Sequence, residues 1–211
     1  MTGGDPQRWT EVDPEPSGEL RELLIAAFGK ATAEHGYANL EIEHVLRHAG
    51  VSRAAFEAHF ASMEQGLLAA QDAFFDRLWL DVAGACEEPG DWPVRVRGAL
   101  SAVLASLVEA SAVARVFAVE AAAASLAAAE RQFAALERFA ALLREGRRHY
   151  PAAAYLPEAT ERALVGGIAS IVSGHLLMED TEALPLLEPQ LVELILIPYL
   201  GEVEARRVAR A

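Results

Sequence analysis

The chain has 211 residues and a formal net charge of −13, and 53% of its residues are hydrophobic. So large an excess of negative charge argues against broad attraction to phosphates or to anionic membranes. The single cysteine, Cys86, excludes an internal disulfide and fits a reducing compartment. We find no secretory signal pattern and no uninterrupted apolar stretch near the ~18 residues of a membrane span, so we expect a cytoplasmic protein.

Helical periodicity begins near the N-terminus. Residues 1–18 contain three prolines and little to bury, which predicts a disordered tail. From Glu19 onward, apolar residues recur at the spacing of one helix face, as Leu20, Leu23, Leu24, Ala27 and Phe28. We expect Gly36 to end this helix in the left-handed conformation that glycine adopts at low cost.

Two short helices follow. The first is expected over about residues 40–48, with Asn39 as its cap, and Ser52 is expected to cap the second. Gly50 lies between them. Two short helices joined by a tight glycine turn are typical of a helix-turn-helix, in which the second helix enters the major groove of DNA.

The rest of the chain also reads as helices with short joints. Ser62 is expected to start a fourth helix that runs to about Ala85. Five more helices are expected at residues 91–109, 112–122, 125–148, 158–179 and 187–200. The sequence therefore predicts an all-α fold.

The N-terminal motif resembles that of a known family. The matching residues are Arg21-x-x-Leu24-x-x-Ala27, Gly36-Tyr37, Ile42-x-x-Val45, Ala49-Gly50-Val51-Ser52 and His59-Phe60-x-Ser62-x-Glu64. In order and spacing they resemble the DNA-binding domain of TetR-type transcriptional regulators. The resemblance implies a helix-turn-helix domain at residues 19–66 and a larger helical regulatory and dimerisation domain at residues 67–211.

Four residues depart from the family pattern. Glu41, Glu43, Glu57 and Met63 stand where the family usually carries donors to DNA phosphates, and none of them donates a hydrogen bond to a phosphate at neutral pH. We expect weakened or atypical operator contacts, made by Ser52, Arg53, Ala54, His44, His48 and His59. Arg53 is the best candidate for a guanine contact; the alternative is that it pairs with Glu57 at i+4.

No metal, cofactor or catalytic site is expected. Glu41, His44 and His48 lie at i, i+3 and i+7, an acceptable spacing for a transition metal, but no fourth ligand is evident, so a solvated polar face is favoured. There is no glycine-rich phosphate loop and no nucleophile beside a plausible base. Cys86 precedes Glu87 and Glu88, whose charges disfavour a reactive thiolate. From the sequence we therefore do not expect the protein to be an enzyme.

The resemblance also implies a ligand pocket among the central helices. Its expected lining is Phe75, Trp79, Leu104, Phe117, Phe133, Phe139 and His175. The alternative is that these residues are ordinary core. The ligand would be a small hydrophobic molecule with one polar handle. A basic cluster at residues 144–149 reads as a solvated helix end.

A homodimer is expected through the last two long helices. Residues 191–197 are apolar on nearly every side, so one helix face needs a partner beyond its own domain. The expected interface is Leu164, Gly167, Ile168, Ile171, Gly174, Leu191, Leu194 and Ile195. The alternative is that these residues fill a monomer core.

Two functions compete at this level. The first is a dimeric, ligand-responsive repressor that binds operator DNA through the helix-turn-helix. The alternative is a ligand sensor or protein-interaction module with the same fold that has lost ordinary DNA binding, which the acidic residues at positions 41, 43 and 57 motivate.

Overall fold

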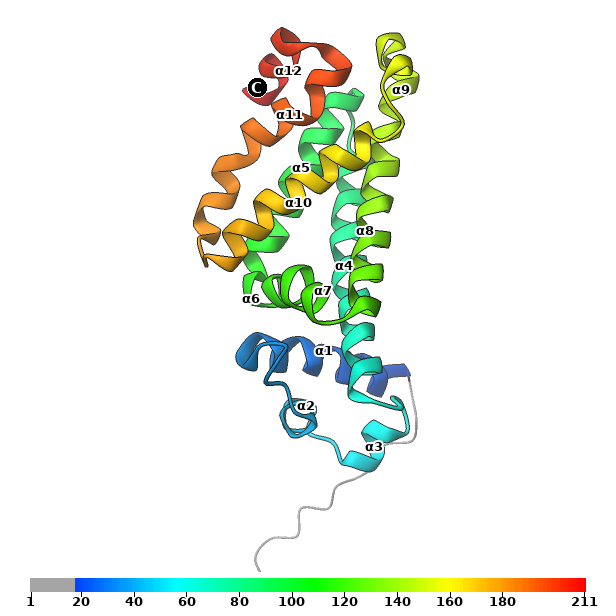
Figure 1. The fold of residues 1–211 in the computed structure, drawn as a ribbon, viewed down its shortest axis with the longest axis vertical. Coiled ribbons are helices and arrows are strands. Elements are labelled where there is room, and N and C mark those ends of the chain that lie inside the picture. The colour runs from blue at the N-terminus through cyan, green and yellow to red at the C-terminus, as the bar shows by residue number, and fades with distance from the viewer. Residues whose placement is uncertain (1–17) are drawn as a thin grey trace, which may run out of the picture. The chain divides into compact units, whose positions relative to one another are not determined.

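The computed structural model describes residues 18–211. Of the expected tail, residues 1–17 therefore lie outside the described part, and Gly18 already begins the first helix. Every regular element in residues 18–211 is a helix, which confirms the all-α fold (Figure 1). The chain divides into two compact units that meet in the sequence at Ala70 and Gln71.

The first unit contains a three-helix arrangement. It holds α1 (Gly18–His35), α2 (Ile42–Ala49), α3 (Arg53–Glu57) and the start of α4 (Met63–Glu87). Its core is a trio of buried rings, Phe28, Phe56 and Phe60, whose centroids lie 5.7–6.0 Å apart. These residues come from α1, from α3 and from the segment after α3, so the core fixes the short α3 on its neighbours.

The turns of this unit follow the sequence signals closely. Gly36 and Gly50 have φ of +73° and +68°, the left-handed values that favour glycine. Ser52 Oγ accepts a hydrogen bond from the Ala55 N–H at 3.1 Å, and Ser62 Oγ accepts one from the Gln65 N–H at 3.1 Å. Both expected serine caps are confirmed.

The expected cap of α2 is wrong. Glu41, not Asn39, is the N-cap residue, and its backbone N–H donates to Nδ1 of His44 at 3.2 Å. Asn39 instead donates its side-chain amide to the His35 carbonyl at the end of α1, at 3.4 Å. His44 stands at the third helical position, where a side-chain acceptor completes a capping box.

The second unit holds the remainder of α4 and all later elements. They are α5 (Trp92–Glu109), α6 (Ser111–Arg115), the π-helical segment η1 (Val116–Glu120), α7 (Ala121–Ala124), α8 (Leu126–Arg144), α9 (Gly146–His149), the 3₁₀ segment η2 (Pro151–Tyr155), α10 (Thr160–Leu177), the 3₁₀ segment η3 (Thr181–Leu187), α11 (Glu188–Leu200) and α12 (Glu202–Ala209). The five expected helices are present, although η1 interrupts one of them. The final helix, α12, was not expected; it packs on α11 and α5.

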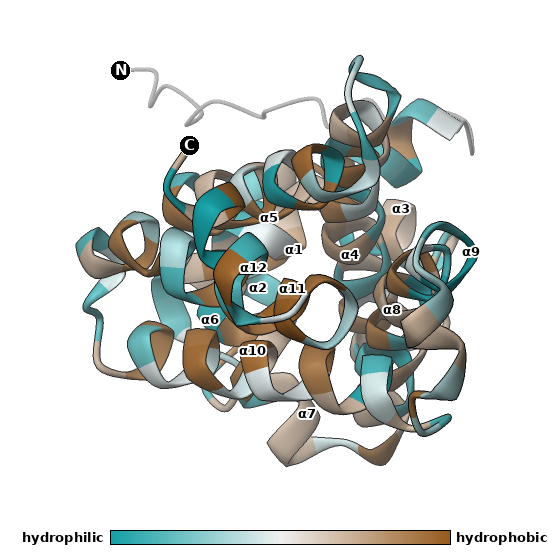
Figure 2. Ribbon diagram, turned by 90° about the horizontal axis from the view of Figure 1, so that it is seen from above, coloured by the Kyte–Doolittle hydropathy of each residue, from teal (hydrophilic) through white to brown (hydrophobic). Residues whose placement is uncertain are grey.

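The apolar helix α11 lies in the core of this unit. Leu191, Val192, Ile195 and Leu196 are all buried within the single chain, and Figure 2 shows hydrophobic residues along α10 and α11. By length and composition residues 181–200 are apolar enough to cross a membrane, as is the bent pair α5 with residues 111–124. Their buried core positions identify α11 as an interior helix of a folded domain.

A buried ion pair joins α9 to α10. Arg147 donates from Nε and Nη2 to the two carboxylate oxygens of Glu161, at 2.6 and 2.8 Å, and the Glu161 side chain is fully buried. Tyr199 on α11 donates to the same carboxylate at 2.9 Å and to the Leu143 carbonyl at 3.1 Å. Arg147 is therefore a structural residue, and the expectation that the whole basic cluster is solvated is wrong.

The protonation of this network follows from its contacts. Burial raises the pKa of Glu161, but the hydrogen bonds from Arg147 and Tyr199 and the charge of Arg147 outweigh it, so the pKa lies below its ordinary value. Burial and the neighbouring carboxylate raise the pKa of Tyr199. The network is thus ionised at neutral pH as a carboxylate–guanidinium pair.

Candidate DNA-binding surface and ligand cavity

The exposed face of α3 is short. Arg53 and Ala54 are exposed at its start, whereas Ala55 and Phe56 are buried in the core of the first unit. Ser52 is occupied as the helix cap. Five helical residues leave only one exposed cation on α3.

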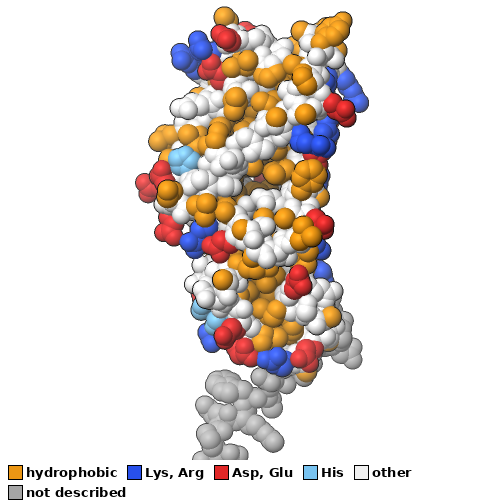
Figure 3. Space-filling model, viewed as in Figure 1, with side chains coloured by type: hydrophobic (Ala, Val, Ile, Leu, Met, Phe, Trp, Pro, Cys, Tyr) orange, Lys and Arg blue, Asp and Glu red, His pale blue; other side chains and the backbone are white. Residues whose placement is uncertain are grey.

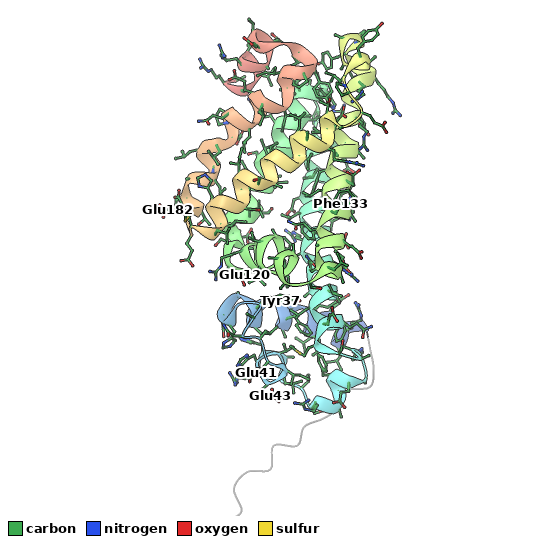
Figure 4. The ribbon with its side chains drawn as sticks, viewed as in Figure 1. Tyr37, Glu41, Glu43, Glu120, Phe133 and Glu182 are labelled. Carbon is green, nitrogen blue, oxygen red and sulfur yellow. The ribbon has the colours of Figure 1, made fainter. Side chains whose placement is uncertain are left out.

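That cation already has an acidic partner. Arg53 Nη2 lies 2.5 Å from Glu43 Oε1 on α2, with 53% and 57% of the two side chains exposed. The alternative partner considered from sequence, Glu57, is not the one found. Glu43 is also four residues before Arg47, yet it pairs across the turn with α3. Figure 4 labels Glu43 on α2 and Glu41, which caps this helix. Any guanine contact by Arg53 must therefore displace a carboxylate.

The α2 histidines face α1. The His44 ring stacks on His35 with centroids 3.7 Å apart, and His48 Nε2 lies 3.1 Å from Glu34 Oε2. The expectation of one freely exposed face with Glu41 is wrong, because both rings are engaged by α1. Within residues 18–211 no group of three His, Cys, Asp or Glu side chains is placed to hold a metal ion.

His59 is half-buried. Its Nε2 is buried and has no hydrogen-bond partner within the described residues. Its expected role at the DNA backbone stays a prediction.

The charge of the first unit is unfavourable for DNA. Residues 19–66 carry four cations and seven anions, a net of −3. Arg47, in the last turn of α2, is exposed and makes no ion pair within the described chain. Arg47 was not among the DNA-contacting residues expected from the sequence. Arg47 and Arg53 are the exposed cations of α2 and α3.

The second unit contains a cavity of about 280 Å³. Stripes of residues on four helices line it, including Phe75 and Leu78 on α4, Leu100 on α5, Phe139 on α8 and Val172 on α10. The lining is almost wholly apolar, and Figure 3 shows the visible face of this unit hollowed near its middle. Such a site suits a ligand with a hydrophobic body.

Two of the seven expected pocket residues, Phe75 and Phe139, line this cavity, and five do not. Leu104 and Phe117 are buried in the core. Trp79 packs beside Phe139 at 5.9 Å, with the Arg138 guanidinium 4.5 Å above its ring.

The last two expected pocket residues lie on the surface. Phe133 is 55% exposed under Arg162 (Figure 4). His175 Nδ1 lies 3.2 Å from Asp180. Both positions are therefore wrong for this cavity.

Five polar residues interrupt the apolar lining: Cys86, Arg95, Gln132, Glu145 and Ser173. None of them was expected as a pocket residue. Burial raises the pKa of the Cys86 thiol, Arg95 opposes this and Glu145 adds to it, so the thiol is neutral. The acidic neighbours in sequence, Glu87 and Glu88, are not the cause.

The π-helical segment η1 is tied to both α4 and the cavity. The Gln71 side chain of α4 is buried, and its Nε2 donates to the Phe117 carbonyl at 3.1 Å and the Ala128 carbonyl at 3.2 Å. Gln132, which lines the cavity, donates to the Ala118 carbonyl at 2.6 Å. Short π segments are frequent at functional sites because they leave carbonyls free for such contacts.

The expected interface residues divide into two groups. On α10, Ile171 is 41% exposed, and a Cβ added at Gly167 or Gly174 would meet open space. Leu194 on α11 is 41% exposed. In Figure 3, hydrophobic side chains gather over α10 and α11. This exposed group, not the centre of α11, offers a surface to a second copy.

The remaining interface candidates face inward. Leu191 and Ile195 are buried in the chain's own core, while Ile168 and Ile195 line the cavity. Leu164 is half-buried against the core. The chain's own domain therefore covers the side of α11 that carries Leu191 and Ile195, whereas Leu194 stays exposed, and the expected dimer interface stays a prediction.

A family model matches the first unit. Residues 24–70 match the model described as "Bacterial regulatory proteins, tetR family". No curated protein sequence matches the chain.

Solved structures share the fold over most of the chain. The fatty acid degradation regulator FadR from Bacillus halodurans has a TM-score of 0.75 at 18% identity, over 89% of this chain and 98% of that one. FadR from Bacillus subtilis, solved with stearoyl-CoA, has a TM-score of 0.69 at 16% identity, over 85% and 98%. A TetR transcription regulator from Haloarcula marismortui has a TM-score of 0.69 at 20% identity, over 85% and 97%. At these identities the likeness concerns the fold alone.

Proposed function

We propose that the chain is a cytoplasmic, dimeric, ligand-responsive repressor that binds operator DNA, and the match of residues 24–70 to the model of the tetR family of bacterial regulatory proteins supports this proposal. Regulators of this family act on DNA and are not enzymes. The proposal extends that assignment to a ligand, a direction of control and a dimer.

One observation carries the ligand-responsive part. The cavity and the helix-turn-helix share α4, whose first turns belong to the first unit and whose Phe75 and Leu78 line the cavity. Gln71 fixes α4 to the Phe117 carbonyl of η1, and Gln132 fixes the same segment to the cavity wall. A ligand that moves Gln132 changes the hydrogen bonds that hold α4, and a tilt of α4 changes the spacing of the two recognition helices in a dimer.

The dimer would use the exposed apolar face of α10 and α11. Ile171, Leu177 and Leu194 are 41%, 55% and 41% exposed, and the glycines of α10 allow close approach of a second helix. A two-fold dimer through this face would contain two copies of α3, the number that two operator half-sites require.

DNA binding tests the proposal. The probe is a labelled fragment of the chain's own upstream region, measured with competitor DNA at two salt concentrations. We expect specific, salt-sensitive binding that Arg53→Ala weakens and that Arg77→Ala, which removes an exposed cation from α4 in the second unit, leaves unchanged. Equal binding of specific and competitor DNA, or no effect of Arg53→Ala, would contradict it.

The Glu43–Arg53 pair favours a second candidate function. With the exposed cation of α3 paired to a carboxylate and a net charge of −3 over residues 19–66, this region is also suited to a basic protein partner. The same titration discriminates the two: absence of binding even at low salt supports a ligand sensor without operator binding.

A further inference from the structure

Arg95 is an unpaired cation in the wall of an apolar cavity. Its Nε is buried and has no hydrogen-bond partner, and its guanidinium makes no ion pair in residues 18–211. The residue as a whole is half-buried, and a buried N–H donor without a partner is costly. Natural proteins keep such a group where something else completes it.

Nothing else in the wall completes it. Cys86 is held neutral, because burial raises the pKa of its thiol. Glu145 also borders the cavity, but it is exposed and does not reach Arg95 within ion-pair distance. Gln132 already donates to the Ala118 carbonyl and lies far along α8 from Glu145. Arg95 is thus the only cation among the lining residues.

The cavity beyond Arg95 is long and apolar. On α5 the lining begins at Trp92, and from Arg95 to Leu107 twelve residues at ~1.5 Å rise span about 18 Å. Matching stripes run from Phe75 to Cys86 on α4 and from Val165 to Leu176 on α10. Arg95, Cys86 and Glu145 gather at one end, and Leu107, Ala118 and Gln132 at the other.

We propose that this cavity binds an amphipathic acid, with a free carboxylate on Arg95 and an unbranched apolar chain along α5. The inference rests on the proposed function, since it names the ligand class of the same site. Nε and one terminal nitrogen of a guanidinium present two parallel N–H donors to the two oxygens of a carboxylate. A chain along the stripe from Val96 to Leu107 then replaces water on an apolar wall.

A charge series at constant chain length tests this on the full-length protein. Decanoate, decanol and decylamine share one alkyl chain and differ in the head group. By calorimetry at neutral pH, we expect decanoate to bind roughly tenfold more tightly than decanol, and decylamine to bind more weakly than both. Decanoyl-coenzyme A forms a further arm, since its thioester places a neutral carbonyl where decanoate has a carboxylate.

Two variants assign the effect to one side chain. Arg95→Met retains most of the apolar volume and removes the charge, so the preference for decanoate over decanol should fall to about one while decanol still binds. Arg97→Met removes the same charge from the same helix outside this cavity, and the preference should stay. Retained binding of decanol also shows that Arg95→Met is folded.

The outcomes separate this inference from the proposed function. Equal binding of decanoate and decanol, a preference that survives Arg95→Met, tighter binding of the thioester in both proteins, or no binding of any probe would each overturn the inference. Loss of specific DNA binding with an intact Arg95-dependent preference would instead overturn the repressor and leave the site assignment standing.

Discussion

Replacing Glu43 by Gln should strengthen DNA binding. Glu43 holds Arg53 in an ion pair across the turn between α2 and α3, and both side chains are more than half exposed. In the free protein such a pair contributes only ~0.2–1 kcal/mol, because water and salt screen it. On DNA, however, the same pair must open before Arg53 reaches a base or a phosphate.

The expected gain follows from that range. Releasing Arg53 saves up to ~1 kcal/mol for each subunit, which is about fivefold in affinity, and a dimer on two half-sites gains roughly 25-fold. The salt dependence adds a second readout. If Arg53 binds a phosphate only in the variant, the slope of log K against log salt steepens by ~0.9 for each subunit; if it makes the same contact in the parent protein, or binds a guanine, the slope stays the same.

Fluorescence anisotropy of a labelled upstream fragment, titrated at several salt concentrations, measures both quantities. Glu22→Gln is the matched control, since it removes one exposed carboxylate from α1 and not from the α2–α3 surface. The double variant that combines Glu43→Gln with Arg53→Ala completes a double-mutant cycle. The reasoning is refuted if Glu22→Gln gives the same gain, or if the gain persists without Arg53.

Three further changes test the fold and the assembly. Gly66→Ala places a methyl group against the buried Phe28 ring and should lower the free energy of unfolding by ~1–3 kcal/mol in urea titrations, whereas Gly29→Ala meets open space and should not. Glu161→Gln should lower the melting temperature at pH 7. Because the folded-state pKa of this carboxyl is lowered, its contribution to stability is present above its ordinary pKa of 4.5 and is lost as the pH falls below that value. The melting temperatures of the parent protein and the variant should therefore converge in acid. Ile171→Glu places a charge on the exposed face of α10 and should give monomers in sedimentation experiments, and an unchanged oligomeric state would remove this face from the interface.

Local signals in the sequence were enough for the helix-turn-helix. Gly36, Gly50 and Ser52 each act through bonds within four residues, so their conformations follow from residue type and spacing. The exception is the cap of α2. Asn39 is a favourable N-cap residue by type, but the His44 side chain accepts from the Glu41 N–H, which makes Glu41 the N-cap of α2. Capping propensity, which scores single residues, does not include this hydrogen bond.

Contacts between distant residues could not be predicted. Arg147 and Glu161 are 14 positions apart and on different helices, so no periodicity joins them. The pocket shows the same limit in part. Phe133 and Phe139 are six residues apart on α8, which separates them by about 120° around the helix, so both could not face one cavity. That error was avoidable, whereas the position of Arg95 in the wall depends on how α5 packs against α4 and α8.

The Glu43–Arg53 pair and the cavity of the second unit fit one regulatory scheme. Coupling between two sites in a protein is typically ~1–3 kcal/mol, a change in affinity of about 5–150-fold. A repressor held on DNA by many phosphate contacts stays bound after a change of that size. On the proposed function, an Arg53 shared between Glu43 and DNA would weaken the operator complex, and the same coupling through Gln71 and α4 would then move it from mostly bound to mostly free. The carboxylates that weaken DNA binding would thus make the repressor easier to release.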